Sequence, residues 1–193
     1  MSVLVWAILG YLLGSIPFGI VITRALGLGD LREIGSGNIG ATNVLRTGNK
    51  PAALATLLLD TFKGAIAVLL ARHFGGDMAA QVAALASFAG HCFPIWLGFK
   101  GGKGVATFLG TLLAMAWPVF LLTGATWLVT AAIGRRSSLA GLVSAASAPV
   151  WMIMTGFGGF AITTALMAAL IFYRHKENIA RLIDGSEPKI GKK

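Results

Sequence analysis

Residues 105–133 read VATFLGTLLAMAWPVFLLTGATWLVTAAI, an apolar run without a charged side chain. At about 1.5 Å of rise per helical residue, this run is too long for one untilted helix across a bilayer core of roughly 30 Å and short for two. Two topologies are therefore open. Either the run forms one tilted span, or Trp117-Pro118 makes a tight turn between two short helices.

The charges around this run separate the two topologies. With a single span, Arg135-Arg136 and the basic tail from Arg174 fall on the side opposite the glycine-rich loops that precede the run. With two short helices, all of the 16 cations except Lys63 and Arg72 share one side. Membrane proteins concentrate Lys and Arg in their cytoplasmic loops. We therefore expect two helices here, with the shared side in the cytoplasm.

The composition predicts an integral membrane protein. Of 193 residues, 56% are hydrophobic and only 12% charged, and the mean hydropathy is +0.79. The other expected spans are Ser2–Thr23, Ala52–Ala71, Met78–Leu97, Leu139–Thr155 and Phe160–Tyr173. The first lacks a basic segment before it, so we expect a retained span rather than a signal peptide. The prediction is one all-α domain over residues 1–193, a polytopic membrane protein with seven transmembrane helices, its N-terminus outside and its C-terminus cytoplasmic.

The composition also excludes several partners. A net charge of +9 in a soluble protein would indicate nucleic acid, but the cations lie in short pieces between apolar runs and form no basic groove with aromatic residues, so we expect none. Cys92 is the only cysteine, which excludes an internal disulfide and a cysteine metal cluster. No His, Cys or carboxylate group has metal-ligand spacing, so we expect neither a metal nor a cofactor.

One polar stretch, Gly35–Arg46 (GSGNIGATNVLR), stands between two apolar runs. Its glycines free the backbone to turn, so that N–H groups can converge on an anion. Additional donors come from side chains: Ser36, Asn38, Thr42, Asn43 and Arg46. We expect an anion cradle at the membrane surface; an ordinary loop between helices is the alternative.

Two further polar segments share the cytoplasmic side in the predicted topology. They are Gly98–Gly104 (GFKGGKG) and Arg174–Asn178 (RHKEN). The three segments together offer many cations and few carboxylates, which suits phosphate groups beside lipid. The second segment is not a Walker A motif, because Leu97 stands in place of its first glycine and Gly104 in place of its Ser or Thr.

Three ordered segments carry a resemblance to a known family. They are Asp30-Leu31-Arg32 with Gly35–Arg46, His91 with Phe93-Pro94 and Phe99–Thr107, and Arg174-His175 with Asn178-Ile179, Arg181-Leu182, Gly185 and Glu187. Ser15-Ile16-Pro17 and Asp60–Gly64 fit the same family. In this order, they make the whole chain similar to the bacterial acyl-phosphate:glycerol-3-phosphate acyltransferases.

The resemblance implies a seven-helix enzyme of the bacterial inner membrane with its active site on the cytoplasmic face. Such an enzyme moves a fatty acyl group from acyl phosphate to the sn-1 hydroxyl of glycerol 3-phosphate, giving lysophosphatidic acid and phosphate in the first acylation step of phospholipid synthesis. The implied partners are both substrates, membrane lipids and a soluble acyl-phosphate synthase. Acyl phosphate has a good leaving group, so the protein chiefly has to position two phosphorylated molecules and offset their repulsion.

The expected roles follow the motifs. The residues proposed as catalytic are Ser36, Lys103, His175 and Asn178. Those proposed to bind substrate are Arg46, Gly37, Asn38, Gly40, Thr42, Asn43, Gly101, Gly102, Ser138 and Glu177. Direct attack by the substrate hydroxyl is favoured over an acylated Ser36, since no Ser-His-Asp order is legible. The general base stays open among His91, His175, Glu177 and a substrate phosphate.

Three residues are expected to support the site: His91, Asp60 and Lys63. Asp60 and Lys63 stand three residues apart in an expected span, hence on one helical face. An unpaired charge there costs at least ~2.5–3.5 kcal/mol on insertion scales, so we expect a buried pair that orders the site. His91 is equally compatible with a hydrogen bond between packed helices.

Two other functions fit the composition less well. A small transporter of a phosphorylated or anionic solute would carry ionisable groups along a path at the midplane and repeated, broken helices. Here Asp60 and Lys63 are nearly alone at that depth, while the other polar residues gather on one face. A membrane scaffold would leave the two loops of glycines and cations unexplained.

Overall fold

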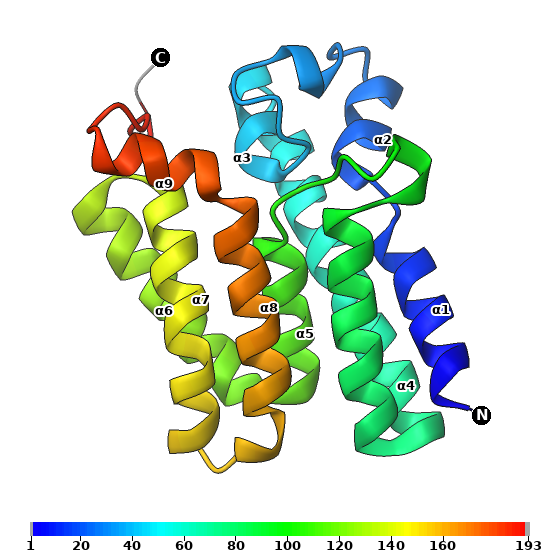
Figure 1. Ribbon diagram of the computed structural model, residues 1–193. Helices are drawn as coiled ribbons and strands as arrows, with labels where there is room; N and C mark the ends of the chain where they lie inside the picture. The colour runs from blue at the N-terminus through cyan, green and yellow to red at the C-terminus, as the bar shows by residue number, and fades with distance from the viewer. Residues whose placement is uncertain (1, 192–193) are drawn as a thin grey trace. The chain divides into compact units, whose positions relative to one another are not determined.

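The computed structural model describes residues 2–191, and every regular element in that range is a helix (Figure 1). Lys192 and Lys193, counted above among the cations of the predicted cytoplasmic side, lie outside the described residues. The chain divides into two compact units, the first ending at Ala114 and the second beginning at Met115. Each unit carries part of the predicted polar residues.

The first unit begins with a helix that breaks where the sequence has Gly14-Ser15-Ile16-Pro17. Helix α1 (Val3–Gly14) ends there and α2 (Phe18–Ala25) follows. Proline lacks an N–H and disfavours helix at the residue before it, which accounts for the break. The break leaves the carbonyl of Ile16 outside a regular helix, where a side chain can reach it.

Helix α4 (Lys50–Cys92) contains one non-helical residue, Gly76, with φ 78° and ψ −172°. The limbs before and after it fold against each other, since Ala71 and Ala79 share one buried cluster and Asp60 lies beside His91. The expected turn at residues 72–77 is therefore shorter than predicted, because one glycine in the left-handed region reverses the chain. Pro51 occupies the first turn, as its fixed φ favours.

Helix α1 packs closely along the second limb of α4. A β-carbon at Gly14 would collide with the backbone of Ser87, and one at Gly10 would lie 3.0 Å from the Ala83 carbonyl. Small residues allow such close approach of apolar helices. Helix α5 (Val105–Met115) packs on the first limb, since Thr107 Oγ1 donates to the Asp60 carbonyl at 2.9 Å.

Short elements carry the first glycine-rich loop. They are η1 (Leu31–Glu33), α3 (Ala41–Val44) and η2 (Leu45–Thr47), and Leu31 and Val44 are fully buried beneath them against the start of α4. A further turn, η3 (Ile95–Leu97), precedes the second glycine-rich loop. The apolar residues thus anchor the first loop, and Ser36, Thr42 and Arg46 of that loop are exposed.

The second unit is a bundle of three long helices with a short one across its end (Figure 1). Its elements are α6 (Trp117–Gly134), α7 (Ser137–Met154), η4 (Gly158–Phe160), α8 (Ala161–Arg174) and α9 (Lys176–Ile183). Helix α5 ends at Met115 and α6 begins at Trp117 with Pro118 in its first turn. The run 105–133 therefore forms two helices, as the charges predicted.

Four stretches in the described residues are long and apolar enough to cross a membrane. They are Val3–Ala25, Lys50–Leu97, Trp117–Gly134 and Ser137–Met154; Val105–Met115 and Gly158–Arg174 are apolar but shorter. The all-helical fold is confirmed. Seven crossings and the sidedness of the termini stay predictions.

Candidate active site

Asn43 fixes the first glycine-rich loop from inside. Its side chain is buried, and its amide donates to the carbonyls of Leu31 and Ile34, each at 2.9 Å. Its Oδ1 accepts the backbone N–H of Ser36 at 3.3 Å. Because both amide protons are used within the protein, Asn43 shapes the loop. Its expected role as a donor to a bound anion stays a prediction.

Arg46 lies across Gly35. A β-carbon at Gly35 would collide with Nη1 and Cδ of Arg46, and the φ of Gly35 is 56°. Glycine is therefore required twice, for the left-handed backbone and for the space that the guanidinium occupies. Since Asn43 ties Ser36 into the same loop, the structure brings Ser36, Asn43 and Arg46 together.

The remaining predicted residues of this loop lie at or near the surface. Ser36, Thr42 and Arg46 are exposed, whereas Gly37, Asn38 and Gly40 are half-buried. Asp30, just before the loop, accepts hydrogen bonds from the side chain and backbone of Arg32. These bonds hold the pKa of Asp30 well below its usual range. The loop is thus exposed and rich in donors, and Asp30, one of the two carboxylates just before it, is already paired.

The second glycine-rich loop closes the C-terminal end of α4. The N–H of Gly101 donates to the Cys92 carbonyl at 3.1 Å, and that of Gly102 to the His91 carbonyl at 3.0 Å. The last carbonyls of a helix lack partners within the helix, so the loop satisfies them. These two N–H groups therefore point into the fold, and the substrate-binding role expected of Gly101 and Gly102 stays a prediction. Of the two lysines in this loop, Lys103 is half-buried and Lys100 is exposed.

Three buried polar side chains, Asp60, Lys63 and His91, form a cluster that contacts this loop through His91. Lys63 Nζ and Asp60 Oδ1 are 2.6 Å apart, and both side chains are almost completely buried. His91 Nδ1 lies 3.6 Å from the same Asp60 oxygen. The predicted pair is confirmed, and His91 belongs to it instead of facing the surface.

His175 stands at the junction of α8 and α9. Its side chain is buried, and its Nδ1 lies 2.8 Å from the Ile171 carbonyl. A carbonyl only accepts, so Nδ1 carries the proton and Nε2 is the nitrogen through which the ring exchanges one. The structure thus fixes both the orientation and the tautomer of this histidine.

Glu187 organises the polar residues of the second unit. It is 7% exposed, and it accepts hydrogen bonds from Asn178 Nδ2 at Oε1 and from Arg181 Nε at Oε2, each at 2.7 Å. Its backbone carbonyl accepts from Arg136 Nε at 3.3 Å. Glu187 was part of the third motif but had no predicted role; its position before Pro188 gives no sign that it is buried.

Ser138 lies at the same carboxylate. Burial by itself raises the pKa of Glu187, but the nearby Ser138 hydroxyl and the hydrogen bonds from Asn178 and Arg181 outweigh it, so the pKa lies below its usual value. Glu187 is therefore ionised at neutral pH. The structure brings Ser138 and Asn178 together through it, and the second unit is not as poor in carboxylates as the sequence indicated.

Glu177, by contrast, is exposed on α9. Its neighbour Asn178 is buried, because successive helical residues point in different directions. Glu187, rather than Glu177, is the carboxylate that accepts a hydrogen bond from Asn178. In the part of the chain that the structure describes, no group of three or more His, Cys, Asp or Glu could hold a metal ion.

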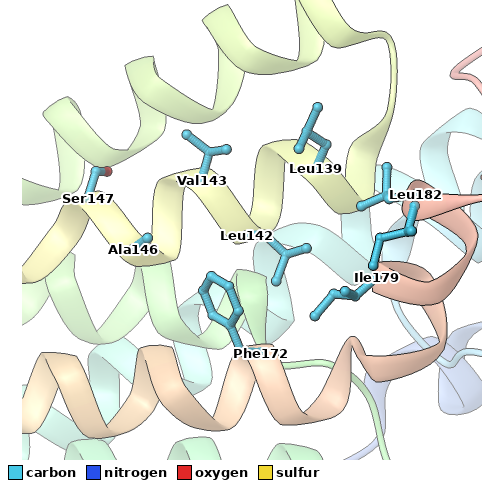
Figure 2. Close-up of a pocket in the computed structure, with 9 residues that line it drawn as sticks. Leu139, Leu142, Val143, Ala146, Ser147, Phe172, Ile179 and Leu182 are labelled. Atoms are coloured by element: carbon cyan, nitrogen blue, oxygen red, sulfur yellow. The ribbon is translucent and has the colours of Figure 1, made fainter.

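An apolar pocket of about 740 Å³ lies in the second unit (Figure 2). Helix α7 contributes Leu139, Leu142, Val143, Ala146 and Ser147, α8 contributes Phe172, and α9 contributes Ile179, Leu182 and Ile183. The hydroxyl of Ser147 donates to the Ser144 carbonyl at 2.9 Å. The pocket therefore suits an occupant made of hydrocarbon, in a size range typical of ligand sites.

Comparison with known proteins identifies the family. The family profile of glycerol-3-phosphate acyltransferase matches residues 4–185. The chain belongs to the glycerol-3-phosphate acyltransferase family. A family member from Cereibacter sphaeroides is 66% identical over 100% of this chain and 92% of its own length. Another, from Ruegeria pomeroyi, is 61% identical over 100% of this chain and 95% of its own length.

Solved structures of one family member are similar throughout. The glycerol 3-phosphate form of PlsY (YgiH), an integral membrane glycerol 3-phosphate acyltransferase, matches with a TM-score of 0.94 at 41% identity, over 99% of this chain and 96% of that one. Its lysophosphatidic acid form matches with a TM-score of 0.93 at 40% identity. The resemblance found in the sequence is thus confirmed, and this member of the acyltransferase family is a multi-pass membrane protein.

Proposed function

We propose that this chain transfers a fatty acyl group from acyl phosphate to the sn-1 hydroxyl of glycerol 3-phosphate, releasing lysophosphatidic acid and phosphate. The observation that carries the proposal is the near-complete match to PlsY in its glycerol 3-phosphate and lysophosphatidic acid forms. The choice of acyl phosphate as donor is supported by the three sequence motifs. No cofactor enters the reaction.

The reaction is a direct acyl transfer. The hydroxyl oxygen attacks the acyl carbonyl carbon, an ester bond forms, and the bond from that carbon to the phosphate oxygen breaks. Phosphate leaves with the electron pair, and the hydroxyl proton passes to a base. An acylated Ser36 is not required, since Ser36 has no histidine among its hydrogen-bond partners in the described residues.

Cations supply most of the binding in this proposal. We assign the phosphate of glycerol 3-phosphate to Arg46, Lys103, His175 and Asn178, and the acyl-phosphate headgroup to the Ser36 loop and Lys103. The assignment is supported by the fixed place of Arg46 over Gly35 and by the Glu187 bond that orients Asn178. Guanidinium and ammonium groups bind phosphate strongly, and they offset the repulsion between the two substrates.

His175 can serve as the base only in place of its contact with the phosphate, because Nε2, the ring nitrogen not bonded to the Ile171 carbonyl, cannot donate to phosphate and accept a proton at once. Its Nδ1–H is directed to the Ile171 carbonyl, which leaves Nε2 as the nitrogen that takes a proton. His91 lies against Gly102 in the buried group, and Glu177 is exposed. A phosphate oxygen of the substrate is the alternative base.

The apolar pocket on α7, α8 and α9 supplies a volume suited to a fatty acyl chain. We further propose seven crossings of the bacterial inner membrane, with the N-terminus outside, the C-terminus inside and the active site facing the cytoplasm. Support comes from the charge bias and from the helix break between Met115 and Trp117. A soluble acyl-phosphate synthase on the cytoplasmic face would deliver the donor.

Purified protein in detergent tests the reaction. Glycerol 3-phosphate is supplied with acyl phosphate, acyl-CoA or acyl carrier protein in parallel, and both phosphate release and lysophosphatidic acid are measured. We expect product from acyl phosphate alone, abolished by Lys103→Ala. Product from acyl-CoA alone would overturn the donor, and no product from any donor with folded protein would overturn the function in favour of anion transport.

A further inference from the structure

We propose that Asp60, Lys63 and His91 form a buried positioning cluster that sets the place of Lys103 for the reaction. This inference rests on the proposed function for the role of Lys103. The three residues touch neither substrate in the assignment above. Their effect is transmitted through the loop of residues 100–104.

The ion pair joins two parts of the fold. Lys63 Nζ contacts Asp60 Oδ1 at 2.6 Å and also donates to the Ile16 carbonyl at 2.8 Å, at the break between α1 and α2. Both side chains are almost wholly buried. Because a buried cation and a buried carboxylate each need a close partner, the pair fixes the first limb of α4 to the break between α1 and α2.

His91 connects this pair to the second glycine-rich loop. One side of its ring faces Asp60, with Nδ1 3.6 Å from Oδ1. The other side lies against Gly102, where a β-carbon would collide with Nε2 and lie 3.0 Å from Cδ2. The carbonyl of His91 also accepts the Gly102 N–H. A movement of Asp60 is thus passed through one ring to the residue before Lys103.

The residue after Lys103 is fixed as well. Gly104 has φ 86°, and a β-carbon there would collide with the ring of Phe88. Three residues further on, Thr107 Oγ1 donates to the Asp60 carbonyl at 2.9 Å. Lys103 therefore stands between two glycines that each pack against a ring of α4, and the chain on both sides of it is tied to Asp60 or its neighbour His91.

Positioning of this kind has a large effect on rate. A displacement of about 1 Å in a group that grips a reacting molecule costs on the order of 100-fold, even when the change is made far from the chemistry. The cluster therefore acts on the reaction although it lies inside the helical core.

Two variants test the cluster, and one serves as control. Asp60→Asn/Lys63→Gln removes both charges together, so no unpaired charge is left in the core. His91→Asn keeps the ion pair and shortens the side chain that touches Gly102. Asp77→Asn breaks the exposed pair with Arg72, an Asp–cation pair in the same helix but away from the loop. Circular dichroism and gel filtration establish that each variant is folded. If the double variant is not folded, His91→Asn alone tests the proposal.

The first readout is a double-mutant cycle with Lys103→Arg. With Lys103 unchanged, we expect Asp60→Asn/Lys63→Gln and His91→Asn each to lower kcat/KM about tenfold or more. On the Lys103→Arg background the same changes should cost within about twofold, since coupled residues are not additive. Asp77→Asn should leave kcat/KM unchanged. Equal losses on both backgrounds, or no loss, would overturn the proposal.

The second readout does not depend on catalysis. Cys92 is the only cysteine, is fully buried, and its carbonyl accepts the Gly101 N–H. Its labelling by a maleimide should be about tenfold faster in the cluster variants than in wild type or Asp77→Asn, because a loosened loop uncovers it. If the wild-type protein makes no product from any donor, the proposed function fails. The labelling rate of Cys92 then tests by itself whether the cluster holds the loop in place. Unchanged labelling would overturn it.

Discussion

The side-chain amide of Asn178 donates a hydrogen bond of 2.7 Å to Oε1 of Glu187, nine residues further along the chain. The same carboxylate holds Arg181 on its other oxygen. Glu187 thus orients Asn178, which is proposed to bind substrate, and holds this part of the second unit together. The first prediction concerns this carboxylate.

We expect Glu187→Gln to lower the free energy of unfolding by about 2 kcal/mol at neutral pH, because hydrogen bonds to a charged acceptor are lost. The pKa of Glu187 in the folded protein lies below its usual 4.5. Its contribution is therefore full above pH 4.5 and is lost as the pH falls through the lower, folded value. Denaturant unfolding at several pH values measures this, and the gap between wild type and variant should close in acid.

The control for that series is Glu177→Gln, the same change on the exposed face of α9. It should leave stability unchanged at every pH. A pH-independent gap for Glu187→Gln would show that the charge of Glu187 is not what stabilises the fold.

We expect Asn43→Asp to loosen the first glycine-rich loop. Aspartate keeps the oxygen that faces Ser36 but loses both donors to Leu31 and Ile34, leaving two carbonyls facing a carboxylate. The loss should be about 2 kcal/mol in unfolding free energy, with lower activity. Thermal unfolding and initial rates measure both. Asn43→Ala should lose no more stability or activity than Asn43→Asp. If Asn43→Asp were as stable and as active as the wild-type protein, the two donors would not matter.

Gly35→Ala should displace Arg46 and so weaken the grip on phosphate. Its matched control is Gly48→Ala. Both glycines have positive φ, of 56° and 85°, but a β-carbon at Gly48 meets no atom within 4 Å. Each change should therefore cost about 1–2 kcal/mol of backbone strain.

Only Gly35→Ala should raise the KM for glycerol 3-phosphate, on the order of 10- to 100-fold. Steady-state kinetics with varied glycerol 3-phosphate separate the two variants. Equal KM values would remove Arg46 from the phosphate site.

Ala146→Phe should fill the apolar pocket and change the preference for donor chain length. We expect kcat/KM for a long-chain acyl phosphate to fall about tenfold while that for a short-chain one stays near wild type. Ala165→Phe, at an exposed position of α8 outside the pocket, is the control. A uniform loss over all chain lengths would place the acyl chain elsewhere.

Local sequence signals predicted the helices well. Pro17 and Pro118 mark the two breaks because proline cannot continue a helix, and the spacing of Asp60 and Lys63 predicts their pairing on one face. Each of these signals lies within a few residues of the feature that it predicts. The family motifs identified the loops that carry polar residues, because each motif lies within the loop that it marks.

The partners of individual donors could not be predicted in this way. Asn43 bonds to Leu31, twelve residues away, and Gly102 to His91, eleven residues before it. Such pairings depend on how a loop folds back on a helix end, which spacing does not show. The same holds for Glu187, whose backbone carbonyl meets Arg136 from the start of α7. The sequence identified groups able to bind an anion, and the structure shows which of them serve the fold.

The bond from Lys63 to the Ile16 carbonyl has a consequence for biogenesis. Helix α1 leaves the ribosome before α4, so the acceptor for the lysine is already in the bilayer when the lysine arrives. Asp60, three residues ahead, enters just before it. An intramembrane cation that would otherwise cost at least ~2.5–3.5 kcal/mol therefore meets both of its partners during insertion, and the order of synthesis helps α4 to integrate.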